Sequence, residues 1–196
     1  MELTQTRVGL APLLRIEDRI SVRRRRADLP AIRGLLAVKK GDRLLDVGGG
    51  TGALAVVICG EEAKAVVLEP NPRKVAFGRS RHPQVEYHEG FAERMPFPDG
   101  SFDGAMAMLS FHHIEDPDRA LRDVQRVLRP SGRFLVEEFY PASSPGAIAR
   151  RLFGRRHGGH HRAYESEELK AALNAAGFRD PITRDGKRSY YLLVVR

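Results

Sequence analysis

The 196-residue sequence contains one cysteine, no tryptophan and no apolar run of the length that crosses a bilayer. The single thiol, Cys59, excludes an internal disulfide and offers no metal-binding spacing. A transmembrane helix needs about 20 predominantly apolar residues, so none is predicted. The first 14 residues also lack the apolar core of a signal peptide. We therefore expect a cytoplasmic protein in which Cys59 is a small core residue.

Acidic residues are scarce in two segments, and these segments carry the net charge of +8. Residues 1–40 hold ten Lys and Arg but only four acids, and they include the run Arg23–Arg26. Residues 140–162 hold five arginines, three histidines and no acid. Such uneven charge indicates a partner for these segments, such as an anionic small molecule or a membrane surface.

Short apolar runs alternate with helical patterns from residue 42 onward. Strands are expected at 43–47, 65–68, 85–87, 102–108, 133–139, 181–184 and 189–195, and helices at 53–59, 72–80, 118–128 and 166–176. Alternation at this spacing is typical of parallel βαβ units with right-handed crossovers. The sequence therefore predicts a doubly wound, Rossmann-like α/β fold with a mostly parallel, seven-stranded sheet.

The two ends of the chain depart from this alternation. The first 40 residues predict two helices, the second with Asp28 as its cap and Pro30 in its first turn. Near the C-terminus, Asp185-Gly186-Lys187 separates two strand patterns and predicts an antiparallel hairpin at the sheet edge. We expect one compact domain, in which residues 1–40 form a helical cover over a ligand-binding part at 41–196.

A glycine-rich turn follows the first expected strand. Leu44 to Val47 leads into Gly48-Gly49-Gly50-Thr51-Gly52, and a helix begins directly afterwards. Glycines allow unusual backbone angles and let a ligand approach the main chain, and the helix N-terminus favours an anionic group. Asp46 stands in an otherwise apolar strand, where an acid is costly unless it faces a polar or cationic partner.

A second acid, Glu69, follows the apolar run Ala65–Leu68 at the carboxyl end of the next strand. In open α/β sheets, ligands bind beyond the carboxyl ends of the strands. A carboxylate at that position can accept two hydrogen bonds from a ribose diol. The turn, Asp46 and Glu69 together predict a site for a ligand with a cationic group and a ribose.

These segments resemble, in order, the motifs of the class I S-adenosylmethionine-dependent methyltransferases, and the resemblance covers about residues 40–180. Leu44–Gly52 is similar to the first motif of the family, and Val66–Asn71 to the second. Gly90–Asp103, Arg126–Arg133 and the stretches Tyr164–Leu169 and Ala176–Phe178 match later elements. The sequence most resembles the branch that contains the ubiquinone and menaquinone methyltransferases, whose members act mainly on small molecules.

The resemblance implies S-adenosylmethionine as cofactor and S-adenosylhomocysteine as product. It assigns the methionine part of the cofactor to Asp46 and the turn, the ribose to Glu69, and the adenine side to residues on the following loops. The implied cofactor contacts are Asp46, Val47, Gly48, Gly49, Gly50, Thr51, Gly52, Glu69, Pro70, Asn71, Ala92, Glu93 and Leu109. Three positions depart from the family pattern: Phe91 replaces an acid on the adenine side, Gly49 replaces another small residue, and Ser131 replaces a glycine.

The segment after the fourth strand suggests how a proton could be removed from a methyl acceptor. His112 and His113 follow the active end of that strand, and histidine titrates near neutral pH. We therefore predict a catalytic role for these two side chains and substrate contacts for four others. The predicted substrate contacts are Phe111, His161, Arg162 and Tyr164. No metal site is predicted, although His157, His160 and His161 are close in sequence, because acids and cysteines are missing around them.

Three alternative functions remain. The first is a nicotinamide-dependent dehydrogenase, because the glycine turn can be aligned with a dinucleotide-binding pattern. Asp46 disfavours this function, because in such enzymes the end of that strand faces a pyrophosphate and is normally apolar. The pI of about 10.0 would suit a methyltransferase that modifies RNA, although no RNA-binding module is recognisable. A cofactor-binding protein without turnover is the third alternative, and the departure at Phe91 favours it.

Overall fold

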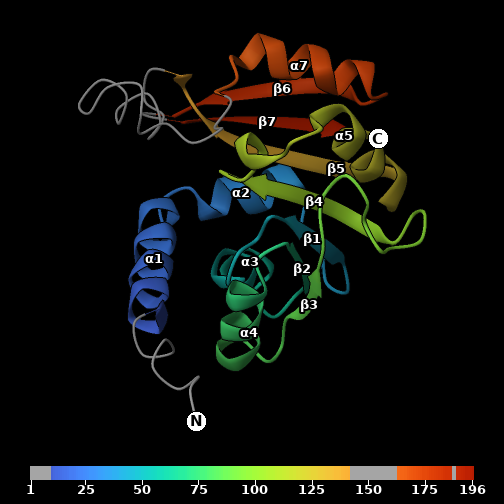
Figure 1. The fold of residues 1–196 in the computed structure, drawn as a ribbon. Coiled ribbons are helices and arrows are strands. Elements are labelled where there is room, and N and C mark those ends of the chain that lie inside the picture. Colours follow the sequence, from blue (N-terminus) through green and yellow to red (C-terminus); the bar gives the residue numbers. More distant parts are fainter. Residues whose placement is uncertain (1–9, 142–162, 187–188) are drawn as a thin grey trace.

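The computed structural model describes residues 10–141, 163–186 and 189–196, which form a sheet covered by helices on both faces (Figure 1). His161 and Arg162, like the histidines before them, lie outside the described residues. The strands are β1 (Arg43–Val47), β2 (Lys64–Glu69), β3 (Glu86–Glu89), β4 (Phe102–Met108), β5 (Leu128–Phe139), β6 (Arg179–Asp185) and β7 (Ser189–Val195). The helices are α1 (Leu10–Arg25), α2 (Leu29–Leu36), α3 (Ala53–Cys59), α4 (Pro72–Arg81), the short 3-10 helix η1 (Phe111–His113), α5 (Pro117–Val127) and α7 (Ser166–Ala175).

The seven strands lie in the order β3-β2-β1-β4-β5-β7-β6. The strands from β3 to β5 are parallel to their neighbours, whereas β7 is antiparallel to both β5 and β6. The predicted α/β class, the mostly parallel sheet and the C-terminal hairpin are therefore confirmed. The strand order reverses direction between β1 and β4, and a reversal of this kind marks the usual ligand crevice of doubly wound folds.

Alternating residues of the strands feed two separate cores. Leu45 and Val66 belong to the core under α5 and α7, whereas Leu44 and Val67 belong to the core under α2, α3 and α4. This alternation follows from the two-residue period of a strand, and it makes central strands of a doubly wound sheet apolar on both faces. Cys59 is buried in the second core, where burial raises the pKa of its thiol to about 12. The prediction of a core cysteine is confirmed.

Some element boundaries differ from the prediction. The third strand begins at Glu86 instead of residue 85, and β5 begins at Leu128 instead of Arg133 because its start pairs with Phe102 across an irregularity. Asp28 does occupy the N-cap position of α2, but its side chain makes no capping hydrogen bond. None of the described helices is both long and apolar enough to cross a membrane.

Candidate functional site

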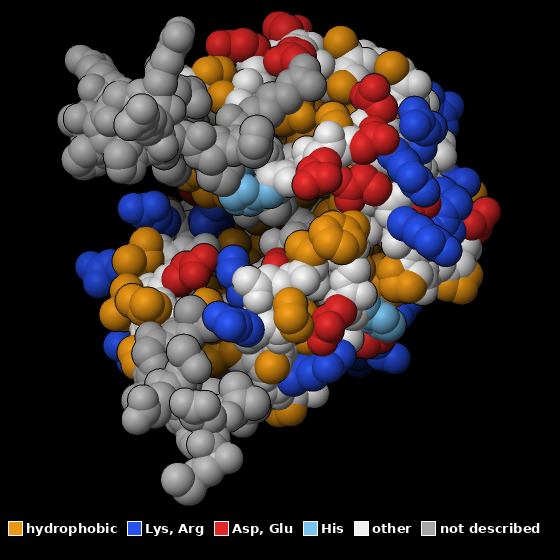
Figure 2. Space-filling view, in the orientation of Figure 1, with side chains coloured by type: hydrophobic (Ala, Val, Ile, Leu, Met, Phe, Trp, Pro, Cys, Tyr) orange, Lys and Arg blue, Asp and Glu red, His pale blue; other side chains and the backbone are white. Residues whose placement is uncertain are grey.

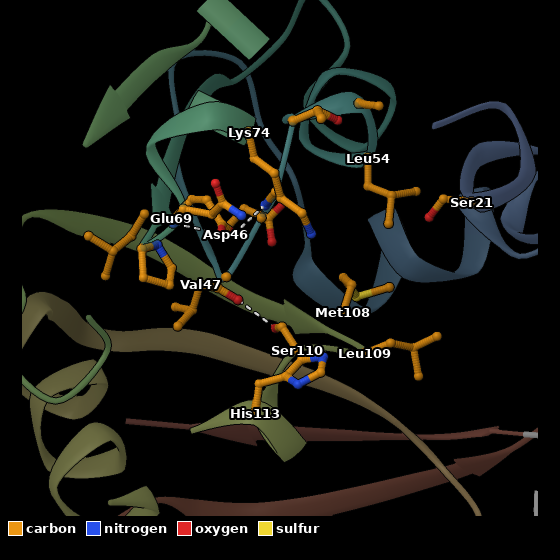
Figure 3. Close-up of a pocket in the computed structure, with 18 of the residues that line it drawn as sticks. Ser21, Asp46, Val47, Leu54, Glu69, Lys74, Met108, Leu109, Ser110 and His113 are labelled. Atoms are coloured by element: carbon orange, nitrogen blue, oxygen red, sulfur yellow. Dashed lines mark hydrogen bonds between the residues drawn. The ribbon is translucent and has the colours of Figure 1, made fainter. Parts of the chain in front are cut away.

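A cavity of about 860 Å³ lies at the carboxyl ends of β1, β2 and β4, where the strand order reverses. Figure 3 shows Asp46, Glu69 and Lys74 grouped at one side of the cavity, with Ser110 and His113 at another. The cavity is also bordered by α1, so the N-terminal helix contributes to its wall. The place predicted from the sequence for a ligand site is thus hollow.

The glycine turn forms the floor of this cavity. Gly48 has a φ of 69° and its N–H donates to the carbonyl of Leu68 at 2.8 Å, so the turn is joined to the end of β2. A Cβ atom at Gly48 would lie 2.7 Å from Cβ of Ser110, closer than side chains pack. Gly50 and Gly52 also have positive φ values, of 59° and 78°. Glycine is therefore required for both the backbone angle and the space at this turn.

Asp46 is buried at the end of β1, with only 2% of the residue exposed. Its Oδ1 atom has no hydrogen-bond partner among the described residues. Burial and, to a smaller extent, the negative charge of Glu69 together raise the pKa of its carboxyl to about 7, although Arg25 opposes the rise. A buried carboxyl oxygen without a partner is costly, so the position is suited to a cationic or hydrogen-bond-donating ligand group.

Glu69 is held in place by the backbone on both sides of it. Its Oε2 accepts a hydrogen bond from the Gly50 N–H and its Oε1 one from the Asn71 N–H, each at 3.0 Å. Asn71 in turn caps α4 by accepting from the Arg73 N–H at 3.0 Å. Each carboxylate oxygen keeps a second lone pair that can accept from a ligand hydroxyl. The predicted acid at the end of β2 is therefore fixed in orientation at the cavity wall.

The loop after β3 also borders the cavity. Ala92 is buried, whereas Phe91 is 65% exposed although it also lines the cavity. Glu93 accepts hydrogen bonds from the N–H groups of Glu115 and Asp116 at 3.1 and 3.3 Å. The Glu93 carboxylate thus joins this loop to the start of α5, a role that the sequence did not suggest.

The end of β4 brings the two predicted histidines to different positions. His113 lines the cavity, together with Leu109 and Ser110, whose hydroxyl donates to the carbonyl of Val47 at 2.6 Å. His112 lies behind it and is not part of the cavity wall. The Nδ1 atom of His112 lies 2.7 Å from Oε2 of Glu138, and its backbone N–H donates to Oε1 of the same carboxylate at 3.1 Å.

Two predicted substrate contacts lie in the core instead. Phe111 is fully buried and Tyr164 is 2% exposed, and their ring centroids are 5.5 Å apart. The carbonyl of Tyr164 also accepts a hydrogen bond from the Tyr190 hydroxyl at 2.9 Å. Neither residue is among those that line the cavity, so the structure gives no support to their prediction as substrate contacts. Both are apolar enough to pack under the cavity, and sequence position alone did not distinguish these two roles.

The helix α1 is attached to the site by polar contacts that the sequence did not reveal. The Thr51 hydroxyl donates to Asp18, and Glu17 lies 3.7 Å from the Lys74 ammonium. Arg25 forms a buried ion pair with Glu137 on β5, with Nε to Oε2 at 2.5 Å. Within the run Arg23–Arg26, Arg25 is therefore buried, with 4% of the residue exposed.

A periodic signal for this attachment is present in the sequence. Leu14, Asp18, Ser21 and Arg25 follow one another at intervals of four, three and four residues, which places them on one face of a helix. Leu14 and Arg25 are buried, and Asp18 and Ser21 are half-buried. The polar residues of this face were not recognised because three of the four would normally be exposed.

Comparison with known proteins agrees with this geometry. The profile of a methyltransferase domain family matches residues 45–136. A ubiquinone/menaquinone biosynthesis C-methyltransferase from Cronobacter sakazakii is 33% identical over 172 residues, which cover 73% of this chain and 68% of that protein. The corresponding protein from Hahella chejuensis is 37% identical over 55% of this chain, and here the alignment spans about half of the relative, 47% of its length.

Solved structures show the same fold. An S-adenosylmethionine-dependent methyltransferase from Thermotoga maritima superposes with a TM-score of 0.71 at 22% identity, covering 94% of this chain and 96% of that one. The doubly wound sheet and the cavity at its reversal point define a Rossmann-like ligand-binding protein. The sequence matches go further: the chain belongs to the class I S-adenosylmethionine-dependent methyltransferase family.

Proposed function

We propose that this protein transfers the methyl group of S-adenosylmethionine to a small acceptor that is anionic or lipid-like. The observation that carries the proposal is the unpartnered buried Oδ1 of Asp46, one strand away from the oriented carboxylate of Glu69. These two acids fit the cationic amino group and the ribose hydroxyls of the cofactor. When bound, the cofactor supplies a methyl group activated by its positively charged sulfur.

The residues of this chain would contribute to methyl transfer chiefly by holding the two reactants in position. The rigid turn at Gly48 and the fixed carboxylate of Glu69 would hold one reactant, while the wall formed by α1 and the end of β4 would hold the acceptor opposite. Proximity and orientation supply about 7–11 kcal/mol of such a barrier when the reacting atoms are held in line. We propose that residues 1–40 serve as a cover in this sense, because α1 lines the cavity and contacts Thr51 through Asp18.

A phenol, enol or amine acceptor also has to lose a proton. His113 lines the cavity and is the candidate for the base that takes it. The ring centroids of His112 and His113 are 4.1 Å apart, and Glu138 fixes the His112 ring from behind. We therefore assign His113 as the candidate catalytic residue and His112, with Glu138, as positioning residues.

An anionic acceptor is supported by Arg24, which lines the cavity from α1. The two basic segments of the sequence suggested such an acceptor, but Arg25 cannot serve because its guanidinium is paired with Glu137. Arg155 and Arg156, which belong to the second segment, lie outside the described residues. The cytoplasmic location expected from the sequence stays a prediction.

Transfer of a labelled methyl group to acidic and neutral small-molecule extracts tests the function. The proposal expects labelled product that disappears in Asp46→Ala. Once an acceptor is found, Arg24→Gln should raise its KM about tenfold, as expected for the loss of one charged contact. Arg26→Gln is the matched control, because Arg26 is exposed and does not line the cavity. Equal KM values in the two variants would refute an anionic acceptor, and methyl label transferred to RNA when RNA is offered instead would establish the alternative RNA-modifying function.

A further inference from the structure

Exposed hydrophobic side chains gather at the mouth of the cavity. Five large hydrophobic residues are exposed in the described part of the chain, and four of them line this one cavity. The four are Leu13, Ile16 and Ile20 on α1 and Phe91 on the loop after β3, with exposed fractions of 62%, 53%, 46% and 65%. The fifth, Ile182, lies on β6 away from the cavity. The rim of the mouth therefore carries exposed apolar side chains from two elements that are far apart in sequence.

The three apolar residues of α1 form an exposed stripe along the side of the helix that borders the cavity mouth. Leu13, Ile16 and Ile20 are separated by three and four residues, which aligns them along a helix. The opposite face carries Leu14 and Arg25, both buried against the domain. The stripe is therefore a second apolar face that the fold leaves in contact with solvent, next to the opening.

Arginines flank this stripe on both sides. At 100° per residue, Arg23 lies on one side of the stripe and Arg24 on the other, and further arginines follow on the outer surface. The exposed arginines of this region are Arg15, Arg19, Arg23, Arg24 and Arg26. None of these five guanidinium groups is paired with an acid within the described ranges. Figure 2 shows hydrophobic and basic side chains together over α1, beside the hollow.

We propose that α1 docks on an anionic lipid surface, with its apolar stripe in the interface and its arginines on the lipid phosphates. This inference rests on the proposed function, because docking would bring the cavity mouth to the place where an amphiphilic acceptor resides. A helix with an apolar stripe bordered by cationic side chains binds the headgroup boundary of anionic membranes. Each Lys or Arg near such a surface contributes about 1 kcal/mol, or about a fivefold gain in binding.

The composition of the surface favours lipid over another protein as the occupant. A second copy of the same face would bring two arginine clusters together, which like-charge repulsion opposes. A stable protein interface also needs about 20–30 residues on each side. The rim has four apolar residues and five arginines, which is small for a dimer but sufficient for reversible attachment to a membrane surface.

Co-sedimentation of the full chain with vesicles tests the proposal. The vesicles are of phosphatidylcholine alone or of phosphatidylcholine with added phosphatidylglycerol. The proposal expects binding to the anionic vesicles only, weakening as salt is raised. Ile16→Gln with Ile20→Gln should lower the vesicle affinity about tenfold, because the apolar groups that would be buried among the lipids are lost. Arg19→Gln with Arg23→Gln should lower it at least tenfold, because two charges are lost.

Matched variants decide whether this surface is responsible. Ile182→Gln removes a similarly exposed isoleucine on β6, and Lys40→Gln with Arg184→Gln removes the same charge elsewhere; both should bind like the original chain. No sedimentation with anionic vesicles, or equal losses in the test and control variants, would overturn the proposal. Dimers abolished by Ile16→Gln with Ile20→Gln would also overturn it, in favour of a second copy.

The readout is independent of catalysis. Cofactor binding measured on the unmodified chain reports the proposed function, whereas sedimentation reports only the lipid contact. A chain that binds S-adenosylmethionine but ignores anionic vesicles keeps its proposed function and loses the docking surface. A chain that binds anionic vesicles but no cofactor keeps the docking surface and loses the proposed function.

Discussion

Gly49 and Asp46 share one corner of the cavity: a Cβ atom on Gly49 would lie 2.6 Å from Cγ of the Asp46 carboxyl. The glycine therefore makes room for the acid that we propose binds the cofactor. The family often has another small residue at the Gly49 position, and in this chain that residue would displace the acid. The departure noted in the sequence thus has a local structural reason.

The first prediction concerns this corner. Gly49→Ala should weaken binding of S-adenosylhomocysteine about tenfold or more, a loss of about 1.4 kcal/mol, because the Asp46 carboxyl has to move. Calorimetry measures the affinity. Gly34→Ala is the control, since nothing lies within 4 Å of a Cβ there and the residue is in α2. It should leave binding unchanged and stabilise the fold by about 0.5–1 kcal/mol. Normal affinity in Gly49→Ala would contradict the account.

The second prediction follows from the raised pKa of Asp46. An unfolded aspartate titrates near 3.9, whereas the folded carboxyl titrates at about 7. Between these values the folded chain keeps a proton that the unfolded chain releases, so Asp46 lowers stability increasingly as the pH rises through this window. The full effect, present above pH 7, is of the order of 4 kcal/mol.

Asp46→Asn removes this titration. Its free energy of unfolding, relative to the original chain, should rise by roughly 2–4 kcal/mol between pH 4 and pH 8. Urea denaturation at several pH values measures the difference. The same variant should bind the cofactor more weakly, because its amide is neutral. A difference that is independent of pH would show that the Asp46 carboxyl titrates normally.

The third prediction separates the two histidines. His113→Ala should lower kcat by about 10²–10⁴ and remove the acid limb of the kcat–pH profile, as expected for the loss of a general base. His112→Ala and Glu138→Gln should lower kcat less and leave cofactor affinity unchanged. His112→Asn should recover part of the loss, because its amide can still donate to Glu138. If His113→Ala kept both kcat and the pH profile, the assignment would fail.

The fourth prediction concerns the buried ion pair between α1 and β5. Arg25→Met leaves the Glu137 carboxylate buried without its partner and should cost about 3–5 kcal/mol of the free energy of unfolding. Replacing both residues, by Met and Leu, should recover most of this loss. Urea denaturation measures both effects, and Arg26→Gln, at an exposed position, should change stability by less than about 0.5 kcal/mol. A stable single variant would show that α1 is not held by this pair.

Local sequence patterns predicted most of the fold. The strands at Arg43–Val47 and Phe102–Met108 and the helix at Ala53–Cys59 have the predicted boundaries. Each is a short apolar run with clear turn residues at its ends, so the pattern is local. The start of β5 was missed because Leu128 joins the sheet through pairing with Phe102, a contact that local periodicity does not contain.

The sequence predicted several of the residues that line the cavity. Asp46 and Glu69 were found because acids at the ends of apolar strands are conspicuous. The partners Glu137 and Glu138 were not, because they act through Arg25 and His112, which lie 112 and 26 residues away in sequence. The burial of Phe111 could not be predicted for a related reason: only packing against Tyr164 shows that it points into the core.

The central claim is that Asp46 and Glu69 bind S-adenosylmethionine, and calorimetry with the original chain, Asp46→Ala and Glu69→Ala tests it most directly. The account predicts micromolar affinity for the original chain and a large loss in both variants, with each variant still folded by circular dichroism. Failure of the original chain to bind at millimolar ligand would contradict the claim and favour a protein without turnover. Undiminished binding in both variants would contradict it equally, because the cofactor would then lie elsewhere.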